Sequence, residues 1–364
     1  MNFARASLPS DTCIAENASP MARDLLNCYA GGAETGIKAD AAQFTHNQRI
    51  KMLGYLLRRI LAAIPVMGVV ALFVFLLLRL TPGDPAAILA GDNATPEQLE
   101  RIRTSLGLNE PLYTQFFTWI GRLLQGDLGV SLISNVPVLK MISTRVEPSI
   151  SIALCTIILA ILVAVPLGVI AAWKHGTWID RFVMGLSVVG FSVPVFVIGY
   201  VLIQIFAIDL RWVPVQGFRS ITAGFGPFFE RIILPTCTLS FIYVALIARM
   251  TRAAMLDVLG EDYVRTARAK GISETGVLLH HALRNAAVPV ITVIGTGFAL
   301  LISGVVVTES VFNLPGIGRL TVDAVLARDY PVIQAMILLT SLIYVTVNLL
   351  IDLAYTLLDP RIRY

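Results

Sequence analysis

Six stretches without a charged residue follow one another between residues 60 and 351. They lie at 60–78, 150–173, 182–208, 232–248, 286–308 and 331–351. Each is close to or above the ~20 residues that an α-helix needs to cross a hydrocarbon core of ~30 Å. Polar and apolar residues do not alternate within them, so they do not resemble strands of a closed barrel, the other structure able to span a bilayer. The pattern predicts six transmembrane helices in an all-α integral membrane protein.

With flanking residues included, the predicted spans are 52–80, 149–173, 182–208, 232–250, 286–308 and 331–355. Composition agrees with lipid as the solvent, since 14% of the residues are charged and the mean hydropathy is +0.76, whereas a soluble domain has about 25% charged residues. The net charge of +4 gives no indication of nucleic acid as a partner. The four cysteines form no CxxC pair and no HExxH motif occurs, so neither a catalytic nor a metal site is predicted.

Lys and Arg concentrate on one side of these spans, as they do in short cytoplasmic loops. They occur before the first span, between the second and third, between the fourth and fifth, and at the end of the chain. Both termini are therefore expected in the cytoplasm, with residues 356–364 as the cytoplasmic C-terminus. Residues 81–148 are then expected in the periplasm, where a region of this length is exempt from the charge rule.

The outer region carries the signals of a small helical cap. Thr95 can cap a helix that has Pro96 at its first position and Gln98 closing a capping box. Gly107 is expected to end that helix. A second helix is predicted over residues 111–124, before Gly126.

The first 51 residues differ from the rest. They contain no apolar stretch long enough for a signal peptide. We expect residues 1–51 to be a disordered cytoplasmic extension, and Met52 is an alternative start because the membrane pattern begins directly after it.

A polar, basic segment at residues 257–285 separates the fourth and fifth spans. The residues from Asp262 to Lys270 predict a short helix that ends at Gly271, with Glu261 and Arg265 as an i, i+4 pair. Ser273 can cap a second helix that runs towards Pro289 and into the fifth span. A solvated loop helix would explain this segment equally well if it stood alone.

Several motifs in order give the segment a more specific meaning. "EDYVRTARAKG", followed by "HALRNA" and a proline, resembles the EAA-x-x-x-G loop of ATP-binding-cassette importer permeases in the form found in the peptide-permease branch. "YLLRRI", "LRLTPGDPA", "LGLNEPLYTQF", "GDLGVS", "FNLPGIGRL", "RDYPVIQ" and "LLDPRIRY" match that branch as well. The resemblance covers Met52 to Tyr364. Arg265 and Thr266 stand where the general pattern has glutamate and alanine, which is usual for the peptide branch.

The resemblance implies a type I ABC importer permease fold, with the transmembrane domain at residues 145–355. It implies that the short helix is a coupling helix seated in a cytoplasmic ATPase. The residues that would carry this contact are Glu261, Asp262, Tyr263, Arg265, Thr266, Ala267, Arg268, Ala269, Lys270 and Gly271. The basic side chains would meet acidic or carbonyl groups, Ala267 and Ala269 would permit close docking, and Gly271 would permit a sharp exit.

The implied partners are a second homologous permease subunit, two cytoplasmic ABC ATPase subunits, a periplasmic solute-binding protein and the lipid bilayer of the inner membrane. A P-loop needs a lysine after a glycine, and none of the five lysines follows one. ATP and Mg²⁺ would therefore bind to the partner ATPase subunits, and this chain is expected to be neither an enzyme nor a cofactor-binding protein. Dipeptides, oligopeptides, glutathione and nickel chelates all remain open as substrates.

Two other classes of membrane protein fit the sequence less well. An ion-coupled secondary transporter usually carries ionisable groups inside its spans, and here the spans are charge-free, although a sodium site of carbonyls and hydroxyls stays open. An intramembrane enzyme is disfavoured because His280 and His281 are adjacent on a predicted helix, so their side chains diverge by about 100°.

The spans contain few polar side chains. They are Ser187, Ser192, Gln204, Thr292, Thr296, Ser303 and Asn348. Interhelical hydrogen bonding is the structural explanation for such residues. Pro194 lies in the middle of the third span, where a kink is expected. Ser192, Pro194, Gln204 and Asn348 are the candidates for lining or gating a pathway.

Overall fold

The computed structural model describes residues 57–76, 86, 95–105 and 107–358. The chain divides into two compact units, residues 1–59 and 60–364, and the contacts discussed below lie within the second. The expected extension at 1–51, its alternative start at Met52 and the C-terminus at 359–364 lie outside the described residues. In the described part of the chain, the one extended pairing is an isolated bridge between Val130 and Pro137.

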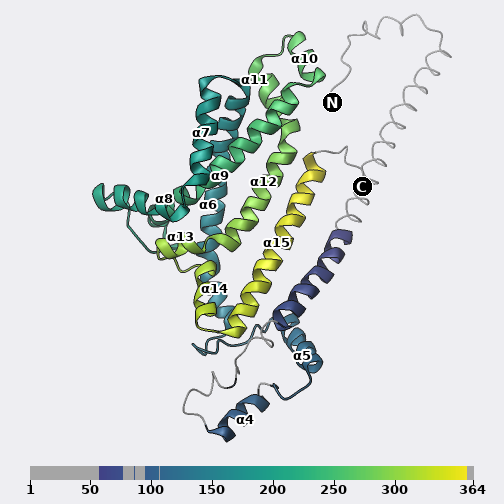
Figure 1. The fold of residues 1–364 in the computed structure, drawn as a ribbon, viewed down its shortest axis with the longest axis vertical. Coiled ribbons are helices and arrows are strands. Elements are labelled where there is room, and N and C mark those ends of the chain that lie inside the picture. The colour runs from purple at the N-terminus through teal and green to yellow at the C-terminus, as the bar shows by residue number, and fades with distance from the viewer. Residues whose placement is uncertain (1–56, 77–85, 87–94, 106, 359–364) are drawn as a thin grey trace, which may run out of the picture. The chain divides into compact units, whose positions relative to one another are not determined.

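The described elements are helices (Figure 1). After an initial helix, Leu57–Leu76, they are α4 (Pro96–Ser105), α5 (Leu112–Leu124), α6 (Val138–Trp173), α7 (Trp178–Ser192), α8 (Val195–Leu202), the π-helix η1 (Ile203–Asp209), the 3₁₀ turn η2 (Ile221–Ala223), α9 (Phe225–Leu259), α10 (Asp262–Ala269), α11 (Glu274–Gly276), the π-helix η3 (Val277–Ala282), α12 (Leu283–Gly304), α13 (Val306–Val311), α14 (Ile317–Leu326) and α15 (Tyr330–Leu358).

Five helical stretches are long and apolar enough to cross a bilayer: Leu57–Leu76, α6, α9, Glu274–Leu301 and Tyr330–Ala354. A sixth is obtained if the helices on either side of Pro194 count as one span, which gives the predicted number. The helices continue beyond the charge-free runs, and α6 begins at Val138 with 36 residues, about 54 Å at 1.5 Å per residue. A charge-free run marks the hydrocarbon crossing, whereas the helix continues into the polar zone on either side.

The predicted span 182–208 is not one continuous helix. α7 ends at Ser192, α8 begins at Val195, and the two axes are bent by 100°; Figure 1 shows α8 turning away from α7. Val193 is extended, with φ −89° and ψ 124°, as expected for a residue before proline. Pro194 has no N–H and starts the next helix. The expected kink is therefore a full break.

α9 is the central helix of the bundle and contacts α6, α7, α8 and α12. Two glycines allow this close packing. A Cβ on Gly168 of α6 would lie 2.6 Å from the Thr251 Cβ, and one on Gly190 of α7 would lie 2.8 Å from the Ala245 Cβ. Because α9 leads directly into α10, its tight packing gives α10 a rigid support.

The start of the outer region has the predicted capping chemistry. The Thr95 N–H donates to Gln98 Oε1 at 3.0 Å and the Gln98 N–H donates to Thr95 Oγ1 at 3.3 Å, forming the capping box of α4. Gly107 follows α4 with φ +66°. α5 packs its Phe116 and Trp119 on Phe75 of the first helix, with ring centroids 5.3 and 5.8 Å apart.

Candidate functional site

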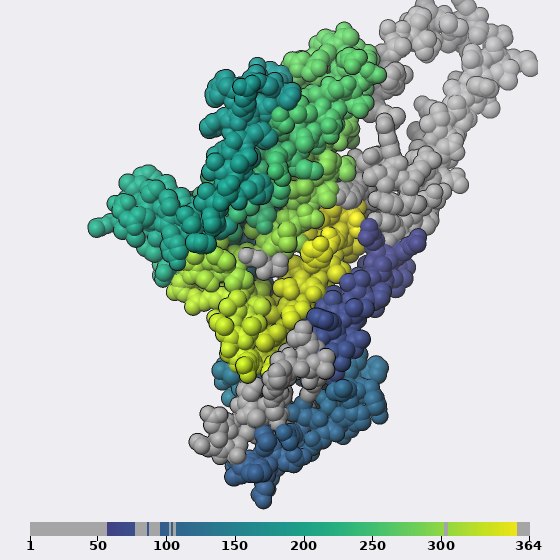
Figure 2. Space-filling model, viewed as in Figure 1, coloured from purple at the N-terminus to yellow at the C-terminus, as the bar shows by residue number. Residues whose placement is uncertain are grey.

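α10, the predicted coupling helix, has one face against its own chain and one face in solvent. Val264 and Ala267 are buried and pack with Val277 of η3. The Ala267 methyl group therefore fills an intramolecular contact, and its expected role in docking a partner stays a prediction. The exposed face comprises Glu261, Asp262, Tyr263, Arg265, Thr266, Arg268, Ala269, Lys270 and Gly271. On the face shown in Figure 2, no coloured segment covers α10 and α11 (green).

The end of α10 depends on Gly271. Its φ is +76°, a left-handed conformation that glycine adopts without a steric penalty. The Gly271 N–H donates to the Arg268 carbonyl at 2.9 Å, and the Ile272 N–H donates to the Ala267 carbonyl at 3.3 Å. A Cβ at Gly271 would meet no atom within 4 Å, so the backbone conformation, and not space within the chain, selects glycine here.

The second helix starts as predicted. Ser273 precedes α11, and its side chain accepts a hydrogen bond from the Gly276 N–H. From α11 the chain runs through η3 into α12 without leaving the helical stretch. A displacement of α10 therefore acts on a helix that continues into the fifth span.

The ion pairs of α10 differ from the prediction. Arg265 pairs with Asp262 at 3.4 Å and not with Glu261, because Glu261 precedes the helix with extended backbone and only its carbonyl joins the first turn. Arg268 Nε and Nη2 donate to the Glu274 carboxylate at 3.0 and 3.4 Å. Arg268 thus clamps the turn between α10 and α11, which leaves Arg265 and Lys270 as the cations directed away from the bundle.

Tyr263 ties α10 to the following span. Its hydroxyl accepts a hydrogen bond from Asn285 Nδ2 at 2.6 Å and donates to the His281 carbonyl at 3.5 Å. Asn285 belongs to α12 and His281 to η3. Within the predicted coupling set, Tyr263 therefore connects the helix to the membrane domain.

A charged cluster that the sequence does not mark joins α7 to α9. Asp180 is 4% exposed, and its carboxylate accepts hydrogen bonds from Arg252 Nε at 2.5 Å, Arg252 Nη2 at 2.8 Å and the Gly176 N–H at 3.0 Å. His175 Nδ1 lies 3.1 Å from the same carboxylate. In the sequence, Asp180 and Arg252 are 72 residues apart, and only the packing of α7 on α9 brings them together.

A second missed residue is Glu309 of α13, which is fully buried. Ser149 Oγ of α6 donates to Glu309 Oε1 at 2.5 Å, and the Arg319 N–H of α14 donates to Oε2 at 2.8 Å. Ser149 Oγ also accepts from the Ile317 N–H at 2.8 Å. A Cβ at Gly316 would collide with this carboxylate. The "FNLPGIGRL" motif is therefore a loop closed around Glu309.

The candidate pathway residues do not form one site. Ser192 and Gln204 make hydrogen bonds within their own segments, to the Val188 carbonyl at 2.9 Å and to Asp209 Oδ1 at 3.0 Å. Asn348 lies half-buried on α15. In the described part of the chain, no hydrogen bond joins these three side chains.

The hydroxyl groups inside the bundle also bond locally. Ser187, Thr292 and Thr296 each donate to the carbonyl four residues earlier at 2.9 Å. In the described part of the chain, the hydrogen bonds of Ser187 and Thr296 are thus within their own helices and not between helices as expected, because a hydroxyl in a helix can bond to its own backbone. The side chain of Ser303 lies outside the described residues.

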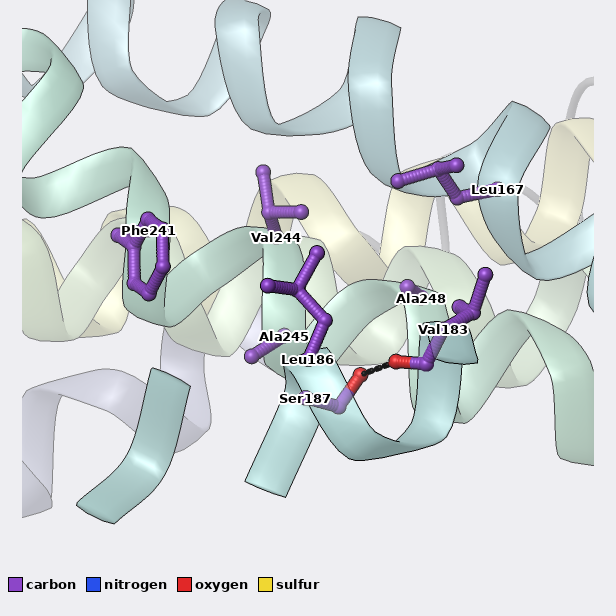
Figure 3. A pocket seen from close by; sticks show the side chains of 8 residues that line it. All are labelled: Leu167, Val183, Leu186, Ser187, Phe241, Val244, Ala245 and Ala248. Carbon is purple, nitrogen blue, oxygen red and sulfur yellow. Dashed lines mark hydrogen bonds between the residues drawn. The ribbon is translucent and has the colours of Figure 1, made fainter. Parts of the chain in front are cut away.

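A small cavity lies between α6, α7 and α9 (Figure 3). Its volume is about 30 Å³, and its lining includes Leu167, Val183, Leu186 and Phe241, with the Ser187 hydroxyl already bonded to the Val183 carbonyl. This is about the volume of one water molecule, whereas a small-molecule site needs roughly 300 Å³ or more. The cavity is a packing gap and not a solute site.

Two family models match the chain. Residues 164–364 match the model described as "Binding-protein-dependent transport system inner membrane component", and residues 52–153 match the N-terminal model of such membrane components. Similar proteins include a probable peptide ABC transporter permease protein, y4tP, of Sinorhizobium fredii. It is 57% identical over 310 residues, which cover 85% of this chain and 99% of that protein.

The glutathione transport system permease protein GsiC of Escherichia coli K12 is 45% identical over 313 residues, covering 86% of this chain and all of GsiC. Among solved structures, a chain of the inward-facing MetNI methionine ABC transporter matches with a TM-score of 0.50 and 14% identity, covering 61% of this chain and 97% of that chain. This likeness supports the all-α permease fold. With the family matches, it confirms the expected resemblance: the chain belongs to the binding-protein-dependent transport family as a membrane-embedded, non-enzymatic permease subunit of an ABC importer.

Proposed function

We propose that this permease forms one half of the translocation pathway of an importer for peptides or similar small solutes. A second homologous permease subunit supplies the other half, two cytoplasmic ATPase subunits drive the cycle, and a periplasmic binding protein delivers the solute. The match to the binding-protein-dependent transport family supports these partners.

α10 is the contact with the ATPase. The observation that carries this proposal is its division into a buried face, which holds it on η3, and a solvent face that includes Arg265, Ala269 and Lys270. Tyr263 and the Ser273 cap connect the helix to α12, and Gly260 alone separates α9 from Glu261. A push on α10 is therefore transmitted to two spans.

The distribution of Lys and Arg supports an orientation with α10 and both termini in the cytoplasm, and α4 and α5 in the periplasm. In this orientation the protein is a multi-pass component of the bacterial inner membrane. The names of y4tP and GsiC support peptides, including glutathione, as the substrate class. The binding protein contributes most of the selection among them.

The test is a purified complex of both permeases and the ATPase subunits in proteoliposomes with the binding protein. Peptide uptake should require ATP, and the charge reversal Arg265→Glu should reduce co-purification of the ATPase at least several-fold. This change puts a second acid three residues after Asp262 and reverses the charge at the proposed contact with the ATPase. Arg101→Glu on exposed α4 is the matched control and should leave co-purification unchanged.

Uptake driven by an ion gradient without ATP would show a secondary transporter and contradict the proposal. Normal co-purification and uptake with Arg265→Glu would contradict only the docking role of α10.

A further inference from the structure

Arg249 is a cation of α9 that lies outside every ion pair described above. Arg249 directly follows the charge-free run 232–248, and its guanidinium carbon lies 5.2 Å from the ring centroid of Phe191 on α7. In the described part of the chain, no carboxylate lies within ion-pair distance of Arg249. Both Arg249 and Phe191 are exposed in the isolated chain.

The register of α7 on α9 gives the depth of this contact. The two helices are antiparallel, since Asp180 binds Arg252 and Gly190 lies against Ala245. Phe191 follows Asp180 by 11 residues, which is about 16 Å along a helix. Asp180 lies next to the cytoplasmic turn in the proposed orientation, and Arg249 precedes Arg252 by three residues, about 4.5 Å along α9. The Arg249 side chain therefore starts near the cytoplasmic end of α9 and reaches a ring that lies deeper on α7.

The Arg249 side chain points to that depth. Helical side chains lean towards the N-terminus of their helix, and the N-terminus of α9 is the periplasmic end in this orientation. A basic residue at a membrane edge normally extends its charge to the interface. Arg249 instead extends away from that interface and contacts an aromatic ring.

A guanidinium that extends into the hydrocarbon zone is costly against lipid. A cation–π contact with phenylalanine offsets only part of that cost. Charged residues inside spans face a water-filled space or an opposite charge and mark a transport pathway. Phe191 also lies one residue before the end of α7, and interrupted helices of this kind form substrate sites in transporters.

We infer that Arg249 binds the carboxylate of the solute as it passes through the importer, with Phe191 holding the guanidinium in place. The inference rests on the proposed peptide transport and names the group that this chain recognises. A guanidinium is suited to this role because its donors match the two oxygens of a carboxylate. The α-carboxylate of a peptide and both carboxylates of glutathione present this chemistry.

The test compares peptides that differ only in that charge. The complete importer in proteoliposomes is given trialanine or trialanine amide, and glutathione or the diamide in which both of its carboxylates are amidated, with the same binding protein throughout. For wild type and for Arg249→Gln, the rate of each acid is divided by the rate of its amide. Because the binding protein is unchanged, a change in this ratio reports on the permease.

We expect Arg249→Gln to lower uptake of trialanine at least tenfold, to change uptake of its amide less than twofold and so to collapse the ratio. Arg181→Gln, an exposed arginine of α7 near the cytoplasmic turn, should leave the ratio at the wild-type value. Arg249→Lys keeps the charge but loses the bidentate geometry, so the KM for trialanine should rise three- to tenfold while that for the amide does not change.

An unchanged ratio in Arg249→Gln, an equal loss of acid and amide, or a wild-type KM in Arg249→Lys overturns the carboxylate role. If Arg249→Gln does not assemble, the KM values of Arg249→Lys decide. If the wild-type importer moves none of the four peptides, the proposed peptide function falls and the carboxylate site falls with it. If the wild-type importer transports these peptides and the variants keep the wild-type ratio of acid to amide uptake, only the carboxylate site is refuted and the proposed peptide function stands.

Discussion

Arg252 binds Asp180 through two parallel hydrogen bonds, with Nε 2.5 Å from Oδ1 and Nη2 2.8 Å from Oδ2. This geometry is the strong, directional form of an ion pair. Arg252 lies two turns before the end of α9, which leads into α10, and Asp180 lies in the first turn of α7. The pair therefore fastens the helix that carries the candidate coupling segment to the helix that breaks at Pro194.

Removing Arg252 should be costly because it leaves the Asp180 carboxylate buried without its cation. We expect Arg252→Ala to destabilise the permease by on the order of 3 kcal/mol and to reduce solute-stimulated ATP hydrolysis. Thermal unfolding of the purified complex and ATPase assays measure the two effects. The double variant Asp180→Ala, Arg252→Ala should be less destabilised than the sum of the single variants. Arg181→Ala, one residue from Asp180 but exposed, is the control. Strict additivity of the two single effects would show that the pair is not coupled.

Gly271 should tolerate only residues that accept a positive φ. Gly271→Val places a β-branched side chain at φ +76°, which costs about 1–3 kcal/mol locally. We expect normal membrane abundance but loss of uptake and of stimulated ATP hydrolysis, because the exit from α10 is displaced. Gly271→Asn should retain most activity, since asparagine visits this region more readily.

The matched control for Gly271 is Gly185→Ala on α7. That glycine has no atom within 4 Å of its Cβ position and no positive φ. Wild-type uptake in Gly271→Val would show that the conformation of this turn has no role in coupling.

The Tyr263 hydroxyl should serve coupling more than assembly. Tyr263→Phe removes the hydrogen bonds to Asn285 and His281 but keeps the ring. We expect stimulated ATP hydrolysis to fall several-fold while co-purification of the ATPase stays near normal. Tyr344→Phe on α15, a half-exposed tyrosine, controls for the loss of a hydroxyl. A parallel loss of co-purification and activity would instead place Tyr263 in the docking contact.

The loop around Glu309 should be sensitive to a single methyl group. Gly316→Ala forces the Glu309 carboxylate away from Ser149 and the Arg319 N–H. Leaving these buried groups unpaired costs about 1–3 kcal/mol, so the melting temperature of the purified complex should fall. Gly226→Ala in α9, where a Cβ meets no atom within 4 Å, should have little effect. Equal melting temperatures for the two variants would contradict the closed loop.

The proposed orientation can be tested by labelling single cysteines in a chain without Cys13, Cys28, Cys155 and Cys237. The reagent is a membrane-impermeant thiol label, added to cells whose outer membrane has been removed and whose inner membrane is sealed. It should modify Ala94→Cys. It should leave Lys270→Cys unmodified until the membrane is permeabilised. The opposite pattern would place α10 outside the cell and rule out its contact with a cytoplasmic ATPase.

Local patterns in the sequence determined the fold class and indicated the candidate coupling segment. Charge-free runs of about 20 residues predict spans because the cost of burying charge in hydrocarbon acts on each segment separately. The capping box of Thr95 and Gln98, the Ser273 cap and the positive φ of Gly271 are contacts or conformations within a few residues. The resemblance to the permease family likewise came from several short motifs in order along residues 52–364.

The tertiary structure decided which of these residues are available to a partner and which are held inside the chain. Ala267 faces η3, Arg268 is held by Glu274, Asp180 meets Arg252, and the Glu309 carboxylate lies between α6 and α14. None of these follows from periodicity, because each depends on the rotation and register of helices that are distant in sequence or separated by a turn. The size of the break at Pro194 has the same origin. A proline removes one hydrogen bond donor, but the 100° angle between α7 and α8 is set by the packing of both helices on α9.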